Sequence, residues 1–206
     1  MQNNLRIVSW VLIRNRQIVF DGETIFEQKD NSTVNFLQTA YEALHINYPR
    51  FFKMDNLCKI GFLAAEILLR NRKLKEKYSA EKVSIVFSCA NSSLDTDIRY
   101  LATMDTAPSP GLFVYTLPNV LTGELCIRNQ IKGEAACFVF NIFDPGFQSE
   151  YINLLFETNK TEAGVSGWAD YYNNEAEAFF YLVEQTEQID LEQHNSVNVT
   201  KIFETI

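Results

Sequence analysis

The sequence predicts an α/β protein in which a mixed sheet of about five strands is covered by helices on both faces. Short, uninterrupted apolar runs at Val83–Phe87 and Ala135–Phe140 are typical of strands that are buried on both faces. Segments with helical periodicity lie between these runs, and helical crossovers favour a sheet between two helical layers. The 206 residues contain no repeat or dividing linker, so we expect one domain over residues 1–206.

The first third of the chain predicts a β-hairpin followed by two helices. The strands are expected at Leu5–Ile13 and Gln17–Phe20, joined by a tight polar turn, and the polar segment Asp21–Thr33 is expected to be a loop. Apolar residues at helical spacing predict a helix over Val34–Leu44. Met54–Lys75 is the clearest helix, because its apolar residues repeat every three and four positions and form one stripe.

Basic residues gather at the end of the second predicted helix: Arg70, Arg72, Lys73, Lys75 and Lys77. Such charges suit a helix C-terminus, where the backbone dipole is negative. A docking patch for an acidic partner is the alternative interpretation.

The remainder of the chain alternates between helices and strands. A helix over Val114–Asn129 is expected to have Thr116 as its cap and Pro118 in its first turn. Gly123 inside this helix costs helix stability unless something packs close to it. The other expected elements are helices at Asp95–Met104 and Phe147–Glu157 and strands at Ala163–Ala169 and Ala178–Glu184.

Composition excludes several classes of function. The net charge of −8 and the pI of about 4.8 argue against general binding to nucleic acids or anionic membranes, because both depend on neutralising phosphates with Lys and Arg. No apolar run approaches the roughly 20 residues that span a bilayer, and no N-terminal segment has the order of a signal peptide. We therefore expect a cytoplasmic protein without a membrane span.

The four cysteines form no C-x-x-C pair, and the two histidines, His45 and His194, lie in polar contexts typical of the surface. We therefore expect no metal site and no cofactor. Cys89 stands where a buried strand should end and a helix begin, a position that can lower a thiol pKa and produce a nucleophile. A packed core thiol is the alternative. Cys137 lies inside an apolar run, where burial raises a thiol pKa.

Four stretches form an ordered set of motifs. Residues 52–65 read Phe-Lys-Met-Asp before an Ala-rich apolar helix face, and residues 85–97 combine a strand, a small-residue turn and Leu-Asp-Thr. Residues 108–133 contain Ser-Pro, Leu-Pro-Asn, Gly-Glu, Ile-Arg and a Gly before the next strand. Residues 163–170 form a Gly-rich strand that ends in Asp. In this order and near this spacing, they resemble the N-terminal half of the bacterial β-ketoacyl synthases.

The resemblance implies one half of a thiolase-like fold. The family joins an acyl group, held on a cysteine as a thioester, to a malonyl unit on acyl carrier protein. That cysteine follows the strand after Gly133, at the start of a helix, and its position falls near Ile142, where no cysteine stands. Cys137 comes too early, and two assisting histidines belong to the family's second half. Loss of such a nucleophile removes several powers of ten in rate.

We therefore expect a non-catalytic ketosynthase-like subunit in fatty acid, polyene or polyketide-type biosynthesis, similar to a chain length factor. One half alone would leave apolar surface uncovered, so we expect a homodimer, or a heterodimer with a full-length ketosynthase. Acyl carrier protein is a further expected partner, because carrier proteins are acidic and the run Arg70–Lys77 is basic. By resemblance to the family's two-fold contact, the dimer strand comprises Ala135, Ala136, Cys137, Phe138, Val139, Phe140 and Asn141.

Two alternatives stay open at this point. The protein could be an active acyltransferase or condensing enzyme that uses Cys89 or Cys137, which a fast-reacting thiol would support. It could also be a stand-alone structural or acyl-binding module, which an apolar tunnel would support.

Overall fold

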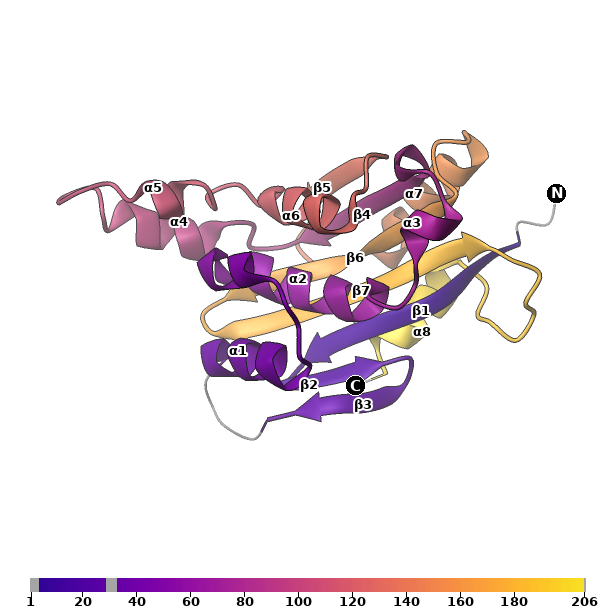
Figure 1. The fold of residues 1–206 in the computed structure, drawn as a ribbon, viewed down its shortest axis with the longest axis horizontal. Coiled ribbons are helices and arrows are strands. Elements are labelled where there is room, and N and C mark those ends of the chain that lie inside the picture. Colours follow the sequence, from indigo (N-terminus) through magenta and orange to yellow (C-terminus); the bar gives the residue numbers. More distant parts are fainter. Residues whose placement is uncertain (1–3, 29–32, 206) are drawn as a thin grey trace.

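A computed structural model describes residues 4–28 and 33–205, and its strands form one mixed sheet in the order β3-β2-β1-β7-β6-β4-β5 (Figure 1). β4 pairs in parallel with β5 and β6, and the other neighbouring pairs are antiparallel. The mixed sheet is confirmed, but it has seven strands and the expected five is wrong. The strands are β1 (Leu5–Arg14), β2 (Gln17–Phe20), β3 (Glu23–Glu27), β4 (Val83–Cys89), β5 (Ala135–Val139), β6 (Ala163–Tyr172) and β7 (Glu175–Gln185).

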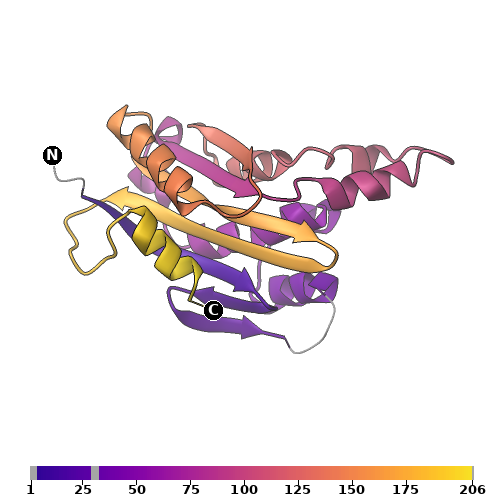
Figure 2. The same ribbon diagram turned by 180° about the vertical axis from the view of Figure 1, so that it is seen from behind.

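Helices cover both faces of the sheet. α1, α2 and α6 lie on the face toward the viewer in Figure 1, and α7 and α8 lie on the other face, seen in Figure 2. The predicted layers are thus confirmed. The helices are α1 (Thr33–Ala43), α2 (Asn56–Leu69), α3 (Leu74–Lys77), α4 (Leu94–Leu101), α5 (Pro110–Phe113), α6 (Val120–Asn129), α7 (Pro145–Glu157) and α8 (Ser196–Phe203), with 3₁₀ turns η1 (Pro49–Lys53) and η2 (Ala80–Lys82).

Two-residue turns with left-handed backbone join three pairs of neighbouring strands. Both residues of Asn15–Arg16, Asp21–Gly22 and Asn173–Asn174 have positive φ. Such turns match the twist of an antiparallel hairpin. The second turn creates β3 from residues that the sequence indicated as loop, so the prediction of a loop over Asp21–Thr33 is wrong for Glu23–Glu27.

The helix predicted over Met54–Lys75 is shorter than expected. α2 ends at Leu69, and the left-handed residue Lys73, with φ 51°, separates it from α3. Nearly every side chain of α2 is buried. If the helix continued in the same direction, the charged side chains that follow would be buried too, so the chain turns away from the helix axis and they reach solvent. Arg70 is the C-cap of α2, and the rest of the basic run lies beyond this helix.

The helix predicted over Val114–Asn129 is also divided. α6 begins only at Val120, after Asn119, and Thr116 is not its cap. Instead, the Thr116 hydroxyl donates to the carbonyl of Phe113, and its own carbonyl accepts from Ser93. Residues 114–119 thus belong to the connection between α5 and α6.

β5 is an edge strand that pairs only with β4. Ala135 and Val139 at its ends are exposed, and its middle residues are half-buried. The prediction that Ala135–Phe140 is buried on both faces is therefore wrong. An apolar run without charges has the same sequence pattern in an edge strand as in a strand with a neighbour on each side, so the pattern does not distinguish the two.

The sheet separates two apolar clusters. One lies beneath α1, α2 and α6 and includes Ile60, Phe87 and Phe180. The other lies beneath α7 and α8 and includes Phe179. α8, which the sequence analysis missed, places Val199 and Ile202 in the second cluster, as each is almost fully buried.

His194 anchors the segment between β7 and α8 inside this second cluster. Its side chain is only 4 % exposed, and its Nδ1 lies 2.9 Å from Oδ1 of Asn153 on α7. Its backbone N–H donates to the carbonyl of Leu5, and its ring packs against Tyr181. The expectation that His194 lies on the surface is wrong, because sequence context did not indicate α8.

Burial lowers the pKa of His194 to about 4. In the unfolded chain this histidine binds a proton near pH 6.5, whereas in the folded chain it stays neutral down to about pH 4. Its contribution to the free energy of unfolding is therefore fully present above pH 6.5 and is lost as the pH falls toward 4. We expect the free energy of unfolding to fall by up to about 3 kcal/mol from this residue over that window. Urea unfolding across pH 4–7 checks this. His194→Asn, which cannot titrate, should flatten the dependence, and identical slopes in both proteins would contradict the assignment.

Candidate functional site

The position that the resemblance predicts for the family's cysteine, near Ile142, falls in the loop between β5 and α7. Ile142 in this loop is 75 % exposed, while Phe143 turns into the second core cluster. The Asp144 side chain then caps α7, because its Oδ1 accepts a hydrogen bond of 2.9 Å from the backbone N–H of Phe147. Pro145 occupies the first helical position. The local sequence thus forms a well-capped helix start.

This helix start is unsuited to acyl transfer. A covalent acyl carrier needs a nucleophile, and residues 140–145 contain no cysteine, serine or histidine. An oxyanion needs free N–H donors, yet Pro145 has none, and the carboxylate of Asp144 already occupies the helix N-terminus. A second negative charge would be repelled there.

Cys89 and Cys137 lie on the same side of neighbouring strands. Cys89 is the fully buried last residue of β4, and a four-residue turn separates it from α4, so it is not at a helix N-terminus as the sequence suggested. Cys137 pairs with Phe87 in the β4–β5 register. A hydrogen bond with Cys137, opposed by burial, lowers the pKa of Cys89. The same hydrogen bond, together with burial, raises the pKa of Cys137.

Neither histidine supports catalysis by these thiols. His194 packs on the opposite face of the sheet from Cys89, and His45 is exposed after α1. Within residues 4–28 and 33–205, no three His, Cys, Asp or Glu side chains gather as metal ligands.

Asp170 fixes the turn after β4. Its carboxylate accepts hydrogen bonds from the backbone N–H groups of Ala90 and Asn91, at 3.0 and 2.8 Å, and from the Asn91 side chain. The motif that ends in Asp170 therefore connects β6 to the start of the α4 segment. Asp170 also borders a cavity of about 630 Å³. This cavity is mostly polar, so it is no apolar tunnel; its lining includes Arg14, Arg16, Asn91, Asn173, Glu175 and Glu177.

Two buried carboxylates hold α6 in place. Glu66 on α2 receives two hydrogen bonds from the Arg128 guanidinium. Glu124 on α6 accepts from the Tyr48 hydroxyl at 2.9 Å and from Arg50 at 2.7 Å. The Arg128 guanidinium also lies over the Tyr48 ring. Glu124 of the Gly-Glu pair thus holds α6 to the η1 segment, and Arg128 of the Ile-Arg pair holds it to α2, which are structural roles.

Motif glycines allow close approach of neighbouring elements. A Cβ atom at Gly61 would collide with Leu121, where α2 crosses α6. At Gly133 a Cβ would meet the backbone carbonyl of Val83 at the start of β4. Backbone atoms cannot move aside as side chains can. These two residues therefore place α6 and β5 tightly against the rest of the fold.

The two edges of the sheet differ in their protection. β3 carries Glu23 and Glu27, and such charges discourage pairing with another strand. β5 carries no charge, and Val139 at its end is 56 % exposed. Beside β5, the rings of Phe138 and Phe147 pack with their centroids 4.8 Å apart. The β5 edge is thus open and apolar, and Phe138 of β5 packs against α7 through Phe147.

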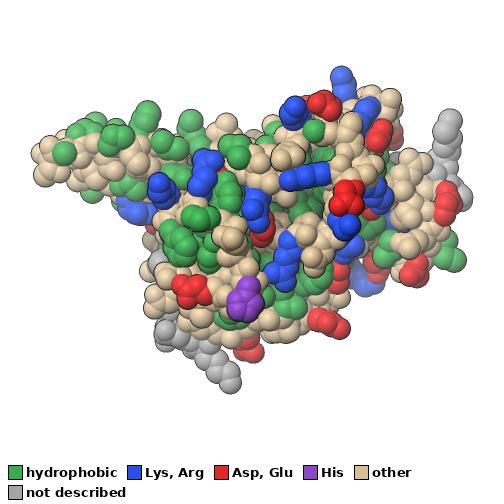
Figure 3. All heavy atoms as spheres, viewed as in Figure 1, with side chains coloured by type: hydrophobic (Ala, Val, Ile, Leu, Met, Phe, Trp, Pro, Cys, Tyr) green, Lys and Arg blue, Asp and Glu red, His purple; other side chains and the backbone are tan. Residues whose placement is uncertain are grey.

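Residues 93–118 project beyond the sheet as an arm that contains α4 and α5 (Figure 1). Its root is fixed, because buried Asp55 caps α2 and also accepts a hydrogen bond of 2.8 Å from Thr96. Tyr100 and Phe113 pack their rings against each other within the arm. Hydrophobic side chains gather over it (Figure 3), and those largely exposed are Leu94, Ile98, Leu101, Met104, Phe113, Val114 and Leu117.

Part of the basic run serves the fold. Arg72 forms an ion pair with Asp21 at 3.3 Å, and Lys77 forms one with Glu184 at 2.8 Å. These contacts connect the α2–α3 segment to the β2–β3 turn and to β7.

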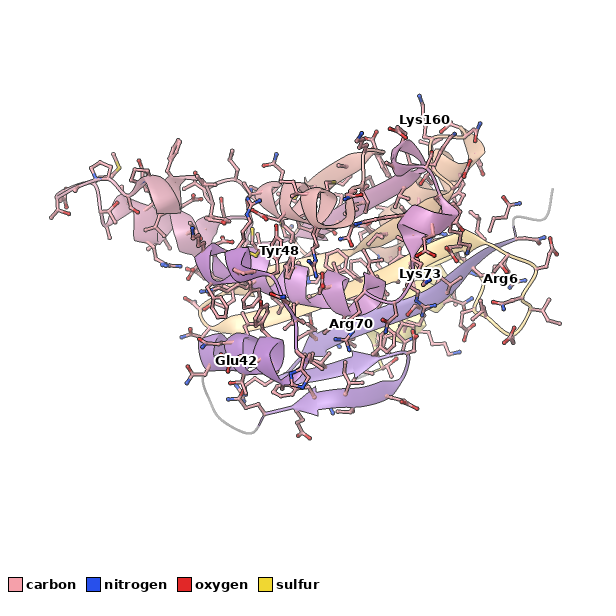
Figure 4. All side chains as sticks on the ribbon, in the orientation of Figure 1. Arg6, Glu42, Tyr48, Arg70, Lys73 and Lys160 are labelled. Atoms are coloured by element: carbon pink, nitrogen blue, oxygen red, sulfur yellow. The ribbon has the colours of Figure 1, made fainter. Side chains whose placement is uncertain are left out.

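The other basic residues border a shallow recess of about 300 Å³ beside α6. Arg70, Lys73 and Lys75 line it together with Arg128. Arg70 and Lys73 lie on the face shown in Figure 4. This recess lies near the amino end of β4, whereas Ile142 follows the carboxyl end of the parallel strand β5. The basic run and the position predicted for the family's cysteine are therefore at opposite ends of the sheet.

No protein-family model matches the sequence, and no curated protein matches it. Among the described residues, no helix is long and apolar enough to cross a membrane.

The fold nevertheless matches solved ketosynthase structures. The ishigamide ketosynthase/chain length factor aligns with a TM-score of 0.66 and 14% identity, over 91% of this chain and 63% of that chain. A ketosynthase in complex with its chain length factor from Xenorhabdus doucetiae aligns with a TM-score of 0.56 and 12% identity, over 88% of this chain and 79% of that chain. A type II polyketide synthase acyl-carrier protein in complex with its ketosynthase aligns with a TM-score of 0.60 and 14% identity, over 89% of this chain and 62% of that chain.

These matches confirm the thiolase-like fold expected from the resemblance. The chain spans less than two thirds of two of the three matched chains. Its described sheet and helices therefore correspond to one part of the ketosynthase fold.

The thiols provide a test of the site. We expect no fast-reacting thiol, because Cys89 is inaccessible and burial raises the pKa of Cys58 and Cys126. Iodoacetamide labelling at mildly acidic pH, measured by mass spectrometry of the intact protein, should be slower for the native protein than for free cysteine. All four cysteines should be labelled after unfolding. A rapid adduct that disappears in Cys89→Ser would support the acyltransferase alternative instead.

Proposed function

We propose that the protein is a non-catalytic, ketosynthase-like subunit that pairs with a full-length ketosynthase, as a chain length factor does, in polyketide, polyene or fatty acid biosynthesis. The observation that carries the proposal is the start of α7. Ile142, Asp144 and Pro145 stand where acyl transfer would need a nucleophile and free N–H donors. The chain would act as one cytoplasmic domain.

The β5 edge is the proposed site of pairing. An unprotected edge strand offers a row of free backbone donors and acceptors, which a strand of the partner would satisfy. Ala135–Asn141 is therefore the proposed dimer strand. The exposed apolar residues of the arm would add contact area, since patches of this kind mark protein interaction sites.

A ketosynthase is favoured over a second copy as the partner. Structures with this fold include complexes of a ketosynthase with its chain length factor. A homodimer of this chain would bring together two copies of a helix start that lacks the nucleophile, whereas a ketosynthase would supply the missing chemistry.

Acyl carrier protein is the second proposed partner. Arg70, Lys73 and Lys75 line a recess that Glu66 and Glu76 also border, and they are the part of the basic run proposed to contact an acidic protein. Arg72 and Lys77 pair with carboxylates of other elements, and Lys73 pairs with exposed Glu76 at 3.1 Å. Long-range attraction to these charges would raise the association rate more than the final affinity.

Val139→Lys tests the dimer strand. A charge on an open edge opposes strand pairing, so we expect the complex with the ketosynthase to weaken by about tenfold or more. Co-expression of this chain with the ketosynthases of its own genome, followed by size-exclusion chromatography with light scattering, measures complex formation.

Thr24→Lys is the matched control, because Thr24 is an exposed residue of the opposite edge strand, β3. It should leave the complex intact. Equal complex formation by wild type and Val139→Lys would contradict pairing through β5.

The double charge reversal Lys73→Glu/Lys75→Glu tests the carrier-protein contact. We expect weaker binding of acyl carrier protein and a smaller salt dependence, measured by titration at two ionic strengths. Lys160→Glu, at an exposed position after α7, is the control. Unchanged binding in the double variant would exclude the basic run as the contact.

A further inference from the structure

Gly123 lies in the middle of α6, and no contact within the chain requires a glycine there. Its side-chain position faces open space, with no atom within 4 Å of a Cβ built there. Gly22 is the one glycine with positive φ in the part of the chain that the structure describes, so Gly123 has ordinary helical backbone. Glycine inside a helix is less favourable than alanine because it loses more backbone freedom on folding.

Three other glycines of the described helices and strands differ from Gly123, whereas Gly111 in the short helix α5 meets only the Ser109 side chain, at 3.9 Å. Gly61, Gly164 and Gly167 each face neighbouring atoms that a Cβ would contact closely. Their absence of a side chain is therefore explained by packing within the fold. The absence of a side chain at Gly123 creates space only on the outer surface of α6.

This outer surface continues into the open edge of the sheet. Ile127 lies one helical turn after Gly123 and is 60 % exposed, which places both on one face of α6. α6 lies beside β5 (Figure 1). Val139, the last residue of β5, is exposed. Ile142, in the loop after β5, is a further exposed apolar residue.

We propose that Gly123 is the point where the backbone of the ketosynthase partner approaches α6 most closely. This inference rests on the proposed function and extends its interface from β5 across the outer face of α6. A residue without Cβ allows close contact between backbones, including contacts from Cα–H to a carbonyl oxygen. Ile127 packs beside this contact.

Gly123→Ala and Gly123→Leu separate a role in folding from a role in assembly. In the isolated chain, Gly123→Ala should raise the melting temperature by about 2–4 °C, because the helix gains propensity and no atom is displaced. Titration with the purified ketosynthase should show weaker binding for Gly123→Ala and a loss of about tenfold or more for Gly123→Leu. Thr39→Ala, at an exposed position of α1, is the control; it should leave binding unchanged.

The outcomes distinguish this inference from the proposed function. If wild type binds the ketosynthase and Gly123→Leu binds equally well, the contact at Gly123 is overturned while the proposed function stands. If Gly123→Ala lowers the melting temperature, glycine serves the fold and the inference is overturned. If wild type binds no ketosynthase, or only itself, the proposed function and this inference both fail.

Discussion

The burial of α2 between the sheet and α6 is the constraint on which the rest of the structure depends. This helix is apolar on nearly every side, and each fully buried Leu or Ile contributes roughly 1.5–3 kcal/mol. Its one buried acid, Glu66, is acceptable only because Arg128 pairs with it. Asp55 caps its start and also holds the arm. The positions of α6, β5 and the arm follow from these contacts.

The motifs that carry the resemblance mark these supports. Gly61 lets α2 approach α6, Glu124 and Arg128 hold α6, and Asp170 secures the turn into α4. None of them contributes a nucleophile or an acid–base group to an open site. A chain can therefore keep these supporting residues, and so keep the fold and its open edge strand, even when it has no catalytic residues. Fold and activity are separable because different residues carry them.

Strong local patterns predicted most of the elements, and missing context explains the errors. The Asp21–Gly22 dipeptide between strands is a hairpin signal, and giving it weight would have identified β3. The open edge of β5 could not be predicted, because Ala135–Val139 shows no charge or alternation that distinguishes edge from interior. The burial of His194 depends on α8 and Asn153, which are brought together only by the tertiary fold.

The loop after β5 shows how little change separates a reactive helix start from an inert one. A helix N-terminus attracts negative charge, which is why such a site can stabilise an oxyanion. In this chain the attraction is already satisfied by Asp144, and Pro145 removes a further donor. The same two residues begin the helix efficiently. Stable capping and anion binding compete for the same N–H groups, so a helix start of this kind fits the proposed role of a subunit that leaves the reaction to its partner.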